Sequence, residues 1–168
     1  LPMAWPYLRR DAKTIRANLP IMILMSVTGI GAFNTLQYIS LVYTTALNVL
    51  LLQSIGPLFV AVWSLLLLGV RLTFAQGIGI ALSIAGVVTI LTQGNPALLS
   101  SITLNRGDVL FLLAMMIFSL YSVLTLKRPA IHALSLAGFT FGVGALCVMP
   151  LFVWEAATQP PIEFALPS

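Results

Sequence analysis

The longest uncharged stretch of the chain decides its fold: residues 17–70 read ANLPIMILMSVTGIGAFNTLQYISLVYTTALNVLLLQSIGPLFVAVWSLLLLGV. No Asp, Glu, Lys, Arg or His interrupts it, and as one helix it would extend roughly 80 Å. The hydrocarbon core of a bilayer takes about 20 residues per crossing, so the stretch predicts two membrane helices joined by a tight turn. The polar cluster Tyr43, Thr44 and Thr45 is the expected turn.

Further apolar runs predict three more helices. Asp108 stands in the first turn of one of them, where a carboxylate favours the positive end of the helix dipole. Glu155, Pro160 and Pro161 mark the expected exit from the last one. The fold class is therefore an all-α integral membrane protein of about five transmembrane helices. The segments after the first two helices are a connection at 71–73, helices at 74–92, 108–126 and 134–154, and a water-facing loop at 93–106.

Composition excludes the common soluble classes. Hydrophobic residues make up 60% of the chain and charged residues 7%, and a small soluble domain has too little interior to bury so much apolar surface. The formal charge of +4 does not indicate nucleic acid, because the basic residues stand at the ends of apolar runs without interleaved aromatic residues. Cys147 is the single cysteine, which excludes a disulfide framework.

The basic residues also predict an orientation. Cytoplasmic loops of membrane proteins carry an excess of Lys and Arg, and five crossings place seven of these eight residues on one side. We therefore expect the residues before the first helix to face the cytoplasm, in a multi-pass protein of the cell membrane. The seven residues are Arg9, Arg10, Lys13, Arg16, Arg71, Lys127 and Arg128, and Arg106 falls on the other side with Asp108, Glu155 and Glu163.

Two sets of polar residues stand out in the first two helices. Asn34, Gln37 and Tyr38 are spaced i, i+3 and i+4, so they share one face of an otherwise apolar helix. The second set lies on the next helix and contains Gln53, Ser54, Pro57 and Ser64. We expect the two faces to look inward together.

Two interpretations of these polar residues remain open. They either pair between helices as hydrogen-bonding contacts or line a solvated substrate path. Pro57 favours the path, because proline frees a backbone carbonyl and helices interrupted in this way occur at the binding sites of transporters. Ser119 and Tyr121 of a later helix are added to the path, although a serine can simply bond to the preceding turn of its own helix.

The chain lacks the residue groups that catalysis needs. Acid–base, nucleophilic and metal chemistry require neighbouring ionisable groups, and the middle turns of the expected helices contain none. His132 has no Cys, Asp or Glu at metal-ligand spacing, and no phosphate-binding glycine motif with its Lys is present. We therefore expect no enzyme activity, no cofactor and no metal site.

Small residues offer surfaces for helix packing. Ala75, Gly79, Ser83 and Gly86 share one face of the third expected helix, and the last helix carries Gly138 and Gly142. We interpret them as packing seams without a role in substrate binding.

Residues 34–92 combine five features: the aromatic end of one helix, the Thr/Ala turn, the step PLF at 57–59, the connection LGVRLT at 68–73 and the glycine-rich helix after it. In this combination they resemble the EamA-like branch of the drug/metabolite transporter superfamily. The segment GDVLFLLAMMIFSLYSVLTLKR at 107–128 is similar to the start of the second repeat of the family. Val70 replaces the usual Glu before Arg71, and Phe118 and Ser119 replace the usual Trp and Ala, so the cavity can differ in shape and polarity.

The resemblance implies a ten-helix carrier built from two inverted five-helix repeats, which moves small metabolites or drugs by alternating access. Residues 1–92 would hold a cytoplasmic loop and the last three helices of the first repeat, 93–106 an extracytoplasmic loop, and 107–168 the first two helices of the second repeat. The expected partners are the lipid bilayer, a small-molecule substrate and the missing helices of the same protein. The alternative is a membrane interaction protein without transport activity that pairs through Gly138 and Gly142, which also allows a homodimer.

Overall fold

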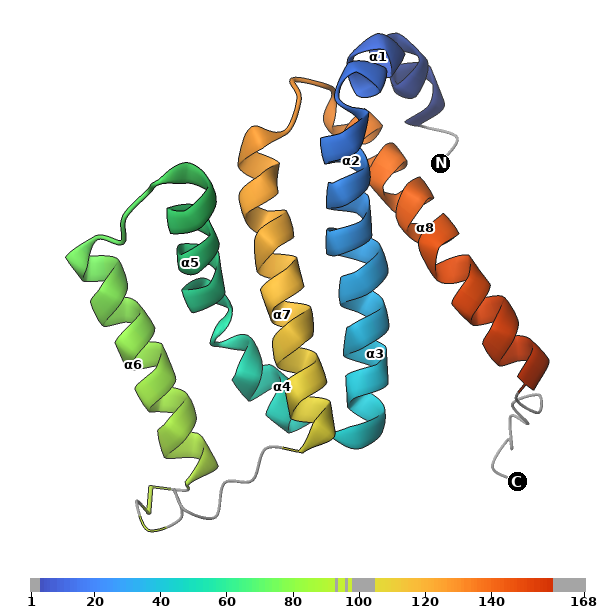
Figure 1. The fold of residues 1–168 in the computed structure, drawn as a ribbon. Helices are drawn as coiled ribbons and strands as arrows, with labels where there is room; N and C mark the ends of the chain where they lie inside the picture. The colour runs from blue at the N-terminus through green and yellow to red at the C-terminus, as the bar shows by residue number, and fades with distance from the viewer. Residues whose placement is uncertain (1–3, 93, 96, 98–104, 159–168) are drawn as a thin grey trace.

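The computed structural model describes residues 4–92, 94–95, 97 and 105–158, and the elements within these ranges are helices (Figure 1). This confirms the predicted all-α class. Most of the loop at 93–106 and the expected exit at Pro160 and Pro161 lie outside the described residues. The helices are α1 (Trp5–Ala17), α2 (Leu19–Ser26), η2 (Val27–Ala32), α3 (Phe33–Tyr43), α4 (Ala46–Gln53), α5 (Gly56–Leu68), α6 (Phe74–Leu91), α7 (Arg106–Leu124), η4 (Thr125–Lys127) and α8 (Ala133–Thr158).

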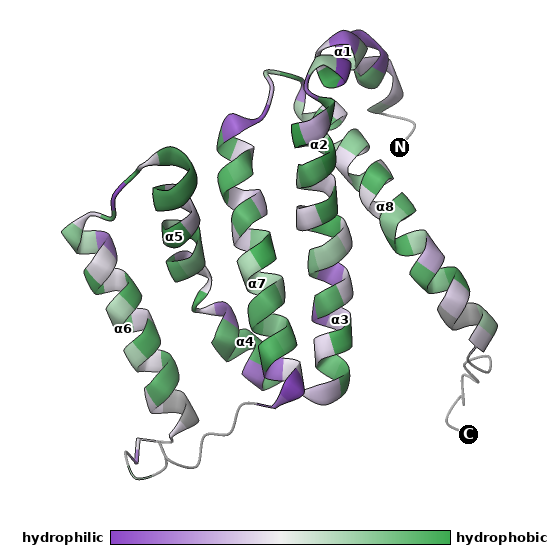
Figure 2. Cartoon of the chain, in the orientation of Figure 1, coloured by the Kyte–Doolittle hydropathy of each residue, from purple (hydrophilic) through white to green (hydrophobic). Residues whose placement is uncertain are grey.

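The described helices suit a bilayer in length and composition. Leu19–Tyr43, Arg106–Lys127 and Ala133–Trp154 are each long and apolar enough to cross a membrane, and α4 with α5 forms a fourth span if the bent pair counts as one. The apolar part of α6, Phe74–Thr89, is shorter, so a fifth crossing stays a prediction. Apolar residues are spread along the helices from α2 to α8, whereas α1 is largely polar (Figure 2), and many large apolar residues are exposed, as expected for surfaces that meet lipid.

The turn expected at 43–45 is confirmed. α3 ends at Tyr43, and Thr44 and Thr45 adopt extended backbone conformations before α4 begins. The Thr45 hydroxyl accepts a hydrogen bond from the Asn48 backbone N–H at 3.3 Å. Threonine thereby satisfies one of the free N–H groups that every helix start exposes, which explains why an apolar sequence turns at this point.

α7 is the central helix of the described bundle. It packs against α3 on one side and against α4 and α5 on the other (Figure 1). A cluster of buried residues, Val49, Leu52, Phe111 and Met115, joins α7 to α4. α7 therefore separates the two helices whose polar faces were expected to meet.

Gly107 allows the start of α7 to approach the end of α3 closely. A Cβ atom at this position would lie 2.5 Å from the Ser40 carbonyl oxygen and 2.7 Å from the Thr44 backbone nitrogen. Both are backbone atoms, which cannot move as a side chain can. Only a residue without a side chain fits this crossing.

A buried polar network fixes the same end of the bundle. The Asp108 carboxylate is 4% exposed and accepts hydrogen bonds from the Thr44 hydroxyl at 2.6 Å and the Asn105 backbone N–H at 3.0 Å. The Asn105 side chain accepts in turn from the Asp108 backbone N–H at 2.8 Å, which completes a reciprocal cap of α7. Asp108 was expected only to favour the helix dipole, whereas it also ties α7 to the α3–α4 turn.

A π-helix, η2, interrupts the first span, and the sequence pattern did not predict it. Its glycines lie against the neighbouring helices: a Cβ on Gly29 would meet the Tyr121 ring at 2.5 Å, and one on Gly31 would meet the Cys147 Cβ at 3.2 Å. η2 therefore lies where the first span approaches both α7 and α8. Such π-helical segments occur mostly as short insertions within α-helices.

The segment before the first span, described above as a cytoplasmic loop, folds as helix α1. Its buried side packs on the start of α8, where a Cβ on Gly138 would lie 2.8 Å from the Ala4 Cβ. The Tyr7 ring stacks on the His132 ring with centroids 4.1 Å apart. Gly138 is therefore occupied by α1 within the same chain, whereas a Cβ on Gly142 would meet nothing within 4 Å.

Asp11 anchors α1 to the start of α8, and we expect this contact to depend on pH. Its carboxylate accepts hydrogen bonds from the Ser135 hydroxyl at 2.6 Å and the His132 backbone N–H at 3.0 Å. These two donors hold the pKa of Asp11 below its ordinary value of 3.8. Because the pKa is lowered in the folded state, the contact stabilises docked α1 above pH 3.8 and is lost as the pH falls through the lowered pKa.

Hydrogen exchange of the α1 amides, corrected for intrinsic rates, measures this loss. We expect the exchange rate of these amides to rise below pH 3.8 in the wild type. In Asp11→Asn the amides should exchange faster already at neutral pH, and their rate should change less with pH. Protection of α1 that stays constant down to pH 2 would contradict the assignment.

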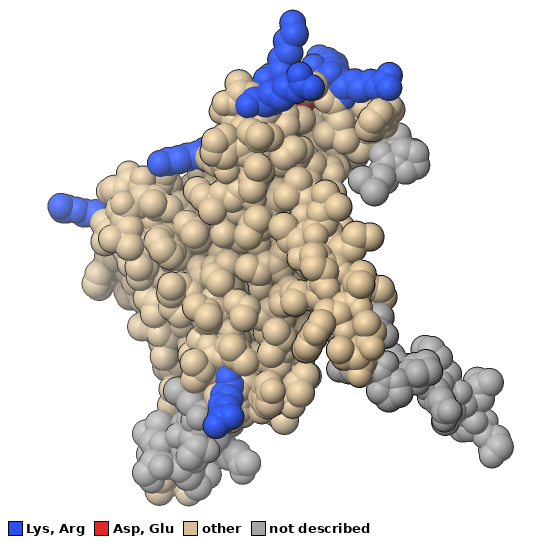
Figure 3. Space-filling view, turned by 45° about the vertical axis from the view of Figure 1, so that its right-hand side comes forward, with Lys and Arg blue, Asp and Glu red and all other residues tan. Residues whose placement is uncertain are grey.

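Cationic side chains gather at one end of the described bundle (Figure 3). α1 carries four of them, and Arg71, Lys127 and Arg128 lie in the connections at the same end. Arg106 begins α7 at the opposite end. The Lys127 amino group donates a hydrogen bond to the Leu67 carbonyl at 3.2 Å, so it also binds the C-terminal end of α5.

Candidate functional site

The break between α4 and α5 is the main irregularity of the second span. The two helices are bent by 41°, and Ser54 and Ile55 between them bond back to the carbonyls of Leu51 and Leu52 in a tighter turn. Pro57 has no N–H, so the Gln53 carbonyl lacks the donor that a continuous helix would supply. The residue pattern around Pro57 predicted a distortion, and the structure places it two residues earlier.

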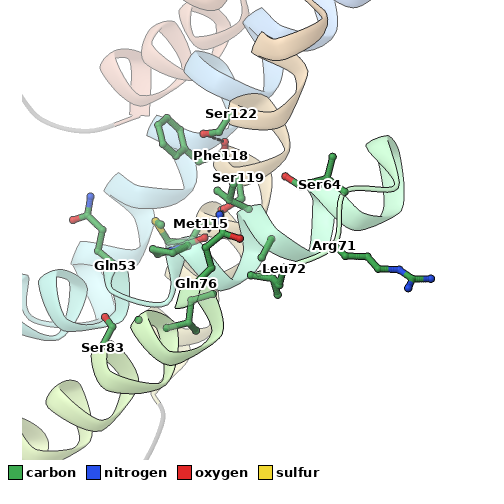
Figure 4. A pocket seen from close by; sticks show the side chains of 17 residues that line it. Gln53, Ser64, Arg71, Leu72, Gln76, Ser83, Met115, Phe118, Ser119 and Ser122 are labelled. Atoms are coloured by element: carbon green, nitrogen blue, oxygen red, sulfur yellow. Dashed lines mark hydrogen bonds between the residues drawn. The ribbon is translucent and has the colours of Figure 1, made fainter. Parts of the chain in front are cut away.

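A cavity of about 720 Å³ lies beside this break, between α5, α6 and α7 (Figure 4). Its walls are mainly apolar and include Met115 and Phe118 of α7. The Phe118 ring is supported from behind by Phe33 of α3, with ring centroids 4.5 Å apart. The uncharged polar residues that line the cavity are Gln53, Ser64, Gln76, Ser83, Ser119 and Ser122.

Two hydroxyl groups connect the cavity wall to the break. The Ser83 hydroxyl of α6 donates to the Ser54 carbonyl at 3.4 Å. The Ser119 hydroxyl of α7 is fully buried and lies 3.5 Å from the Gly56 carbonyl, although its shorter bond is to Met115 of its own helix at 2.7 Å. A Cβ on Gly56 would meet the Met115 side chain at 2.7 Å, so α7 packs directly on the break.

The structure brings together only part of the predicted path. Gln53, Pro57 and Ser119 line the cavity, and Ser54 contributes its carbonyl through Ser83. Ser64, which shares the helix face of Gln53 and Pro57, lines it as well.

The predicted residues of α3 lie elsewhere. Asn34 donates to the Ile30 carbonyl at 2.8 Å, and Tyr38 is 72% exposed. Neither of them, nor Gln37, lines the cavity, because α7 stands between α3 and the break (Figure 1). Tyr121 also lies outside the cavity, with its ring against Gly29.

Sequence reasoning missed several residues of the cavity wall. Gln76 follows the α5–α6 connection, and its side chain accepts a hydrogen bond from the Thr73 backbone N–H at 2.9 Å, a capping pattern that was readable from the sequence. Gly79 and Ser83 were interpreted as a packing seam, but both line the cavity, and a Cβ on Gly79 would meet nothing within 4 Å. Their spacing in the sequence is the same whether such residues pack against another helix or line a cavity.

Arg71 borders the cavity through its position in the α5–α6 connection, but its side chain points away from it (Figure 4). The other polar residues of the wall are uncharged. Within the described residues no group of three His, Cys, Asp or Glu side chains is placed to hold a metal ion.

Comparison with known proteins identifies the family of the chain. The EamA-like transporter family matches residues 1–92, which is more than half of the chain. The chain is 27% identical over 152 residues to the uncharacterized transporter YyaM of Bacillus subtilis, covering 90% of this chain and 49% of that protein. It is 28% identical over 162 residues to an uncharacterized transporter of Archaeoglobus fulgidus, covering 95% of this chain and 55% of that protein.

The chain spans about half the length of these curated relatives. No solved structure matches it. The relatives are named as transporters, and the apolar helices suit the membrane that a transporter requires. The chain belongs to the EamA-like transporter family.

Proposed function

We propose that the full-length protein moves small metabolites or drugs across the cell membrane by alternating access, and that the cavity beside the α4–α5 break lies on the substrate path. The observation that carries this is a cavity of about 720 Å³ at an interrupted membrane helix. Ligand cavities have roughly 300–1,000 Å³, and transporters use interrupted helices because their free backbone groups can bind substrate.

The chemistry of the wall supports an uncharged, zwitterionic or amphipathic substrate. Apart from Arg71, whose side chain points away, its polar side chains are amides and hydroxyls, and most of the wall is apolar. Gln53, Ser54, Pro57 and Ser119 are the residues that we place on the path. Asn34, Gln37, Tyr38 and Tyr121 would then face a second part of the path, on the other side of α7.

Flux into proteoliposomes made with the full-length protein tests the proposal. A panel of labelled neutral and zwitterionic small molecules is the probe, and Gln53→Ala should lower the flux of transported compounds roughly fivefold, because it removes a polar contact. Gln37→Ala is the comparison variant: Gln37 is an α3 amide outside this cavity, so its effect on flux tests the second part of the path separately. The variants are compared at equal protein content.

Each outcome separates the alternatives. Equal losses in both variants would extend the path to the α3 face, and no loss in either would remove both residues from it. If no compound crosses faster than in protein-free liposomes, the carrier proposal fails and an interaction protein without transport activity is favoured.

We also infer the orientation and the division into repeats. The seven cationic residues at the α1 end support a cytoplasmic position for that end. The family match that stops at residue 92, followed by α7 and α8, supports a first repeat that ends with α6. Compartment-reporting tags inserted after Arg71 and Asn95 should report opposite sides; the same side for both would contradict the crossing by α6.

A further inference from the structure

We propose that the cavity beside the α4–α5 break selects uncharged substrates that donate hydrogen bonds, and that it disfavours carboxylates. This inference rests on the proposed function, because it assigns a substrate class to the same cavity. It follows from counting which protons and lone pairs the wall has left to offer.

Three of the four serine hydroxyls that line the cavity have already used their protons, and the exception is Ser64. Ser119 donates to the Met115 carbonyl at 2.7 Å, Ser122 to the Phe118 carbonyl at 3.1 Å, and Ser83 to the Ser54 carbonyl at 3.4 Å. A hydroxyl has one proton and two acceptor lone pairs. Ser83 and Ser122 are half-buried, so each presents lone pairs to a ligand, and a ligand bonds to them by donating. Ser119 is fully buried and supports the wall from behind.

The helix break adds acceptors at the same place. Pro57 leaves the Gln53 carbonyl without its helical donor. The Leu58 N–H bonds to Ile55 at 2.9 Å, so the Ser54 carbonyl has only the long bond from Ser83. Carbonyl oxygens freed in the interior of a membrane protein need donors, and a bound substrate can supply them.

Donors that could neutralise a carboxylate are few. The Ser64 hydroxyl and the Gln53 and Gln76 amides are uncharged donors, and the Arg71 side chain points away from the cavity (Figure 4). An anion would have to lose its hydration against serine lone pairs, Met115 and Phe118, which is costly without a cationic partner. A neutral molecule with an apolar body and one N–H or O–H group can pack against the apolar wall and donate a hydrogen bond to a serine or to a carbonyl freed at the break.

Equilibrium dialysis of three matched probes against the purified full-length protein tests this at pH 7. Indole has one N–H donor, 1-methylindole lacks it, and indole-3-carboxylate adds an ionised group. We expect indole to bind roughly fivefold more tightly than 1-methylindole, the ratio of one net hydrogen bond, and more tightly than the carboxylate.

Two variants locate the effect. Ser122→Ala and Ser83→Ala should each reduce the preference for indole over 1-methylindole, and both residues are half-buried, so the variants leave the core intact. Ser26→Ala is the control: like Ser122, Ser26 donates to a carbonyl of its own helix, that of Met22 at 2.7 Å, but it lies on α2 outside the cavity. It should leave the preference unchanged.

The inference is overturned if 1-methylindole binds as tightly as indole, if indole-3-carboxylate binds more tightly, or if none of the three binds. It is also overturned if Ser26→Ala changes the preference as much as both cavity variants do. Preference for indole without flux of any compound would contradict the carrier proposal and leave the donor selectivity standing. Flux of a compound without a preference for indole would support the carrier proposal and contradict the donor selectivity.

Discussion

Gly107→Ala should destabilise the protein strongly, because the new Cβ would overlap backbone atoms at the crossing of α7 and α3. It would lie 2.5 Å from the Ser40 carbonyl oxygen and 2.7 Å from the Thr44 nitrogen, so the two helices must separate. Overpacking of this kind costs about 1–3 kcal/mol, and contact with backbone places this site at the upper end. Thermal unfolding in detergent, followed by intrinsic fluorescence, measures the loss.

Gly77→Ala is the control for helix propensity. Gly77 is exposed on α6, and a Cβ there would meet nothing within 4 Å. This change should be neutral or stabilise by roughly 0.5–1 kcal/mol, because alanine favours a helix over glycine. Equal unfolding temperatures for the two variants would show that α7 does not cross α3 at Gly107.

Asp108→Ala should produce the second large loss of stability. The substitution removes the acceptor of the Thr44 hydroxyl and of the Asn105 backbone N–H, and it breaks the reciprocal cap of α7. Hydrogen bonds to a charged group contribute about 1.5–3 kcal/mol each, and buried partners left unsatisfied add to the cost. We expect a decrease of about 3 kcal/mol in the free energy of unfolding, measured by denaturant titration in detergent.

A double-mutant cycle assigns this loss to the Thr44 contact. Asp108→Asn keeps an acceptor oxygen, so it should cost less than Asp108→Ala. Thr44→Val combined with Asp108→Ala should cost less than the sum of the single changes, since the two side chains share one bond. Strict additivity would mean that the two residues act independently.

The sequence predicted the structure correctly where a residue pattern has a single common structural role. Uninterrupted apolar runs predicted the spans, Thr44 and Thr45 predicted the turn, and Pro57 predicted a distorted second span. These features follow from the needs of a local backbone: burial in lipid, a cap for free N–H groups and a missing donor. They do not depend on which helices become neighbours.

Features that depend on neighbours could not be predicted in this way. The polar faces of α3 and α4–α5 were expected to meet, but the crossing permitted by Gly107 brings α7 between them. Periodicity tells which residues share a face and not which helix that face contacts. The wall residues Gln76 and Ser83 were missed for the same reason, because their role arises from α6 lying opposite α7 across the cavity.

Two local features were also missed. The π-helix η2 occurs in a run of small and β-branched residues that resembles ordinary helix in composition. α1 was described as a loop because its four basic residues mask its apolar side, yet Ala4, Leu8 and Ile15 supply enough buried surface to dock it on the bundle.

The gathering of cations at the α1 end has an energetic consequence in a polarised membrane. That end carries seven Lys and Arg side chains and the carboxylate of Asp11, a net of six positive charges. Moving one elementary charge against the transmembrane voltage requires about 2.3 kcal/mol per 100 mV, so carrying the charges of this end alone across the membrane would require about 14 kcal/mol at that voltage. Once inserted with this end on the electrically negative side, the molecule is held in that topology by the voltage itself.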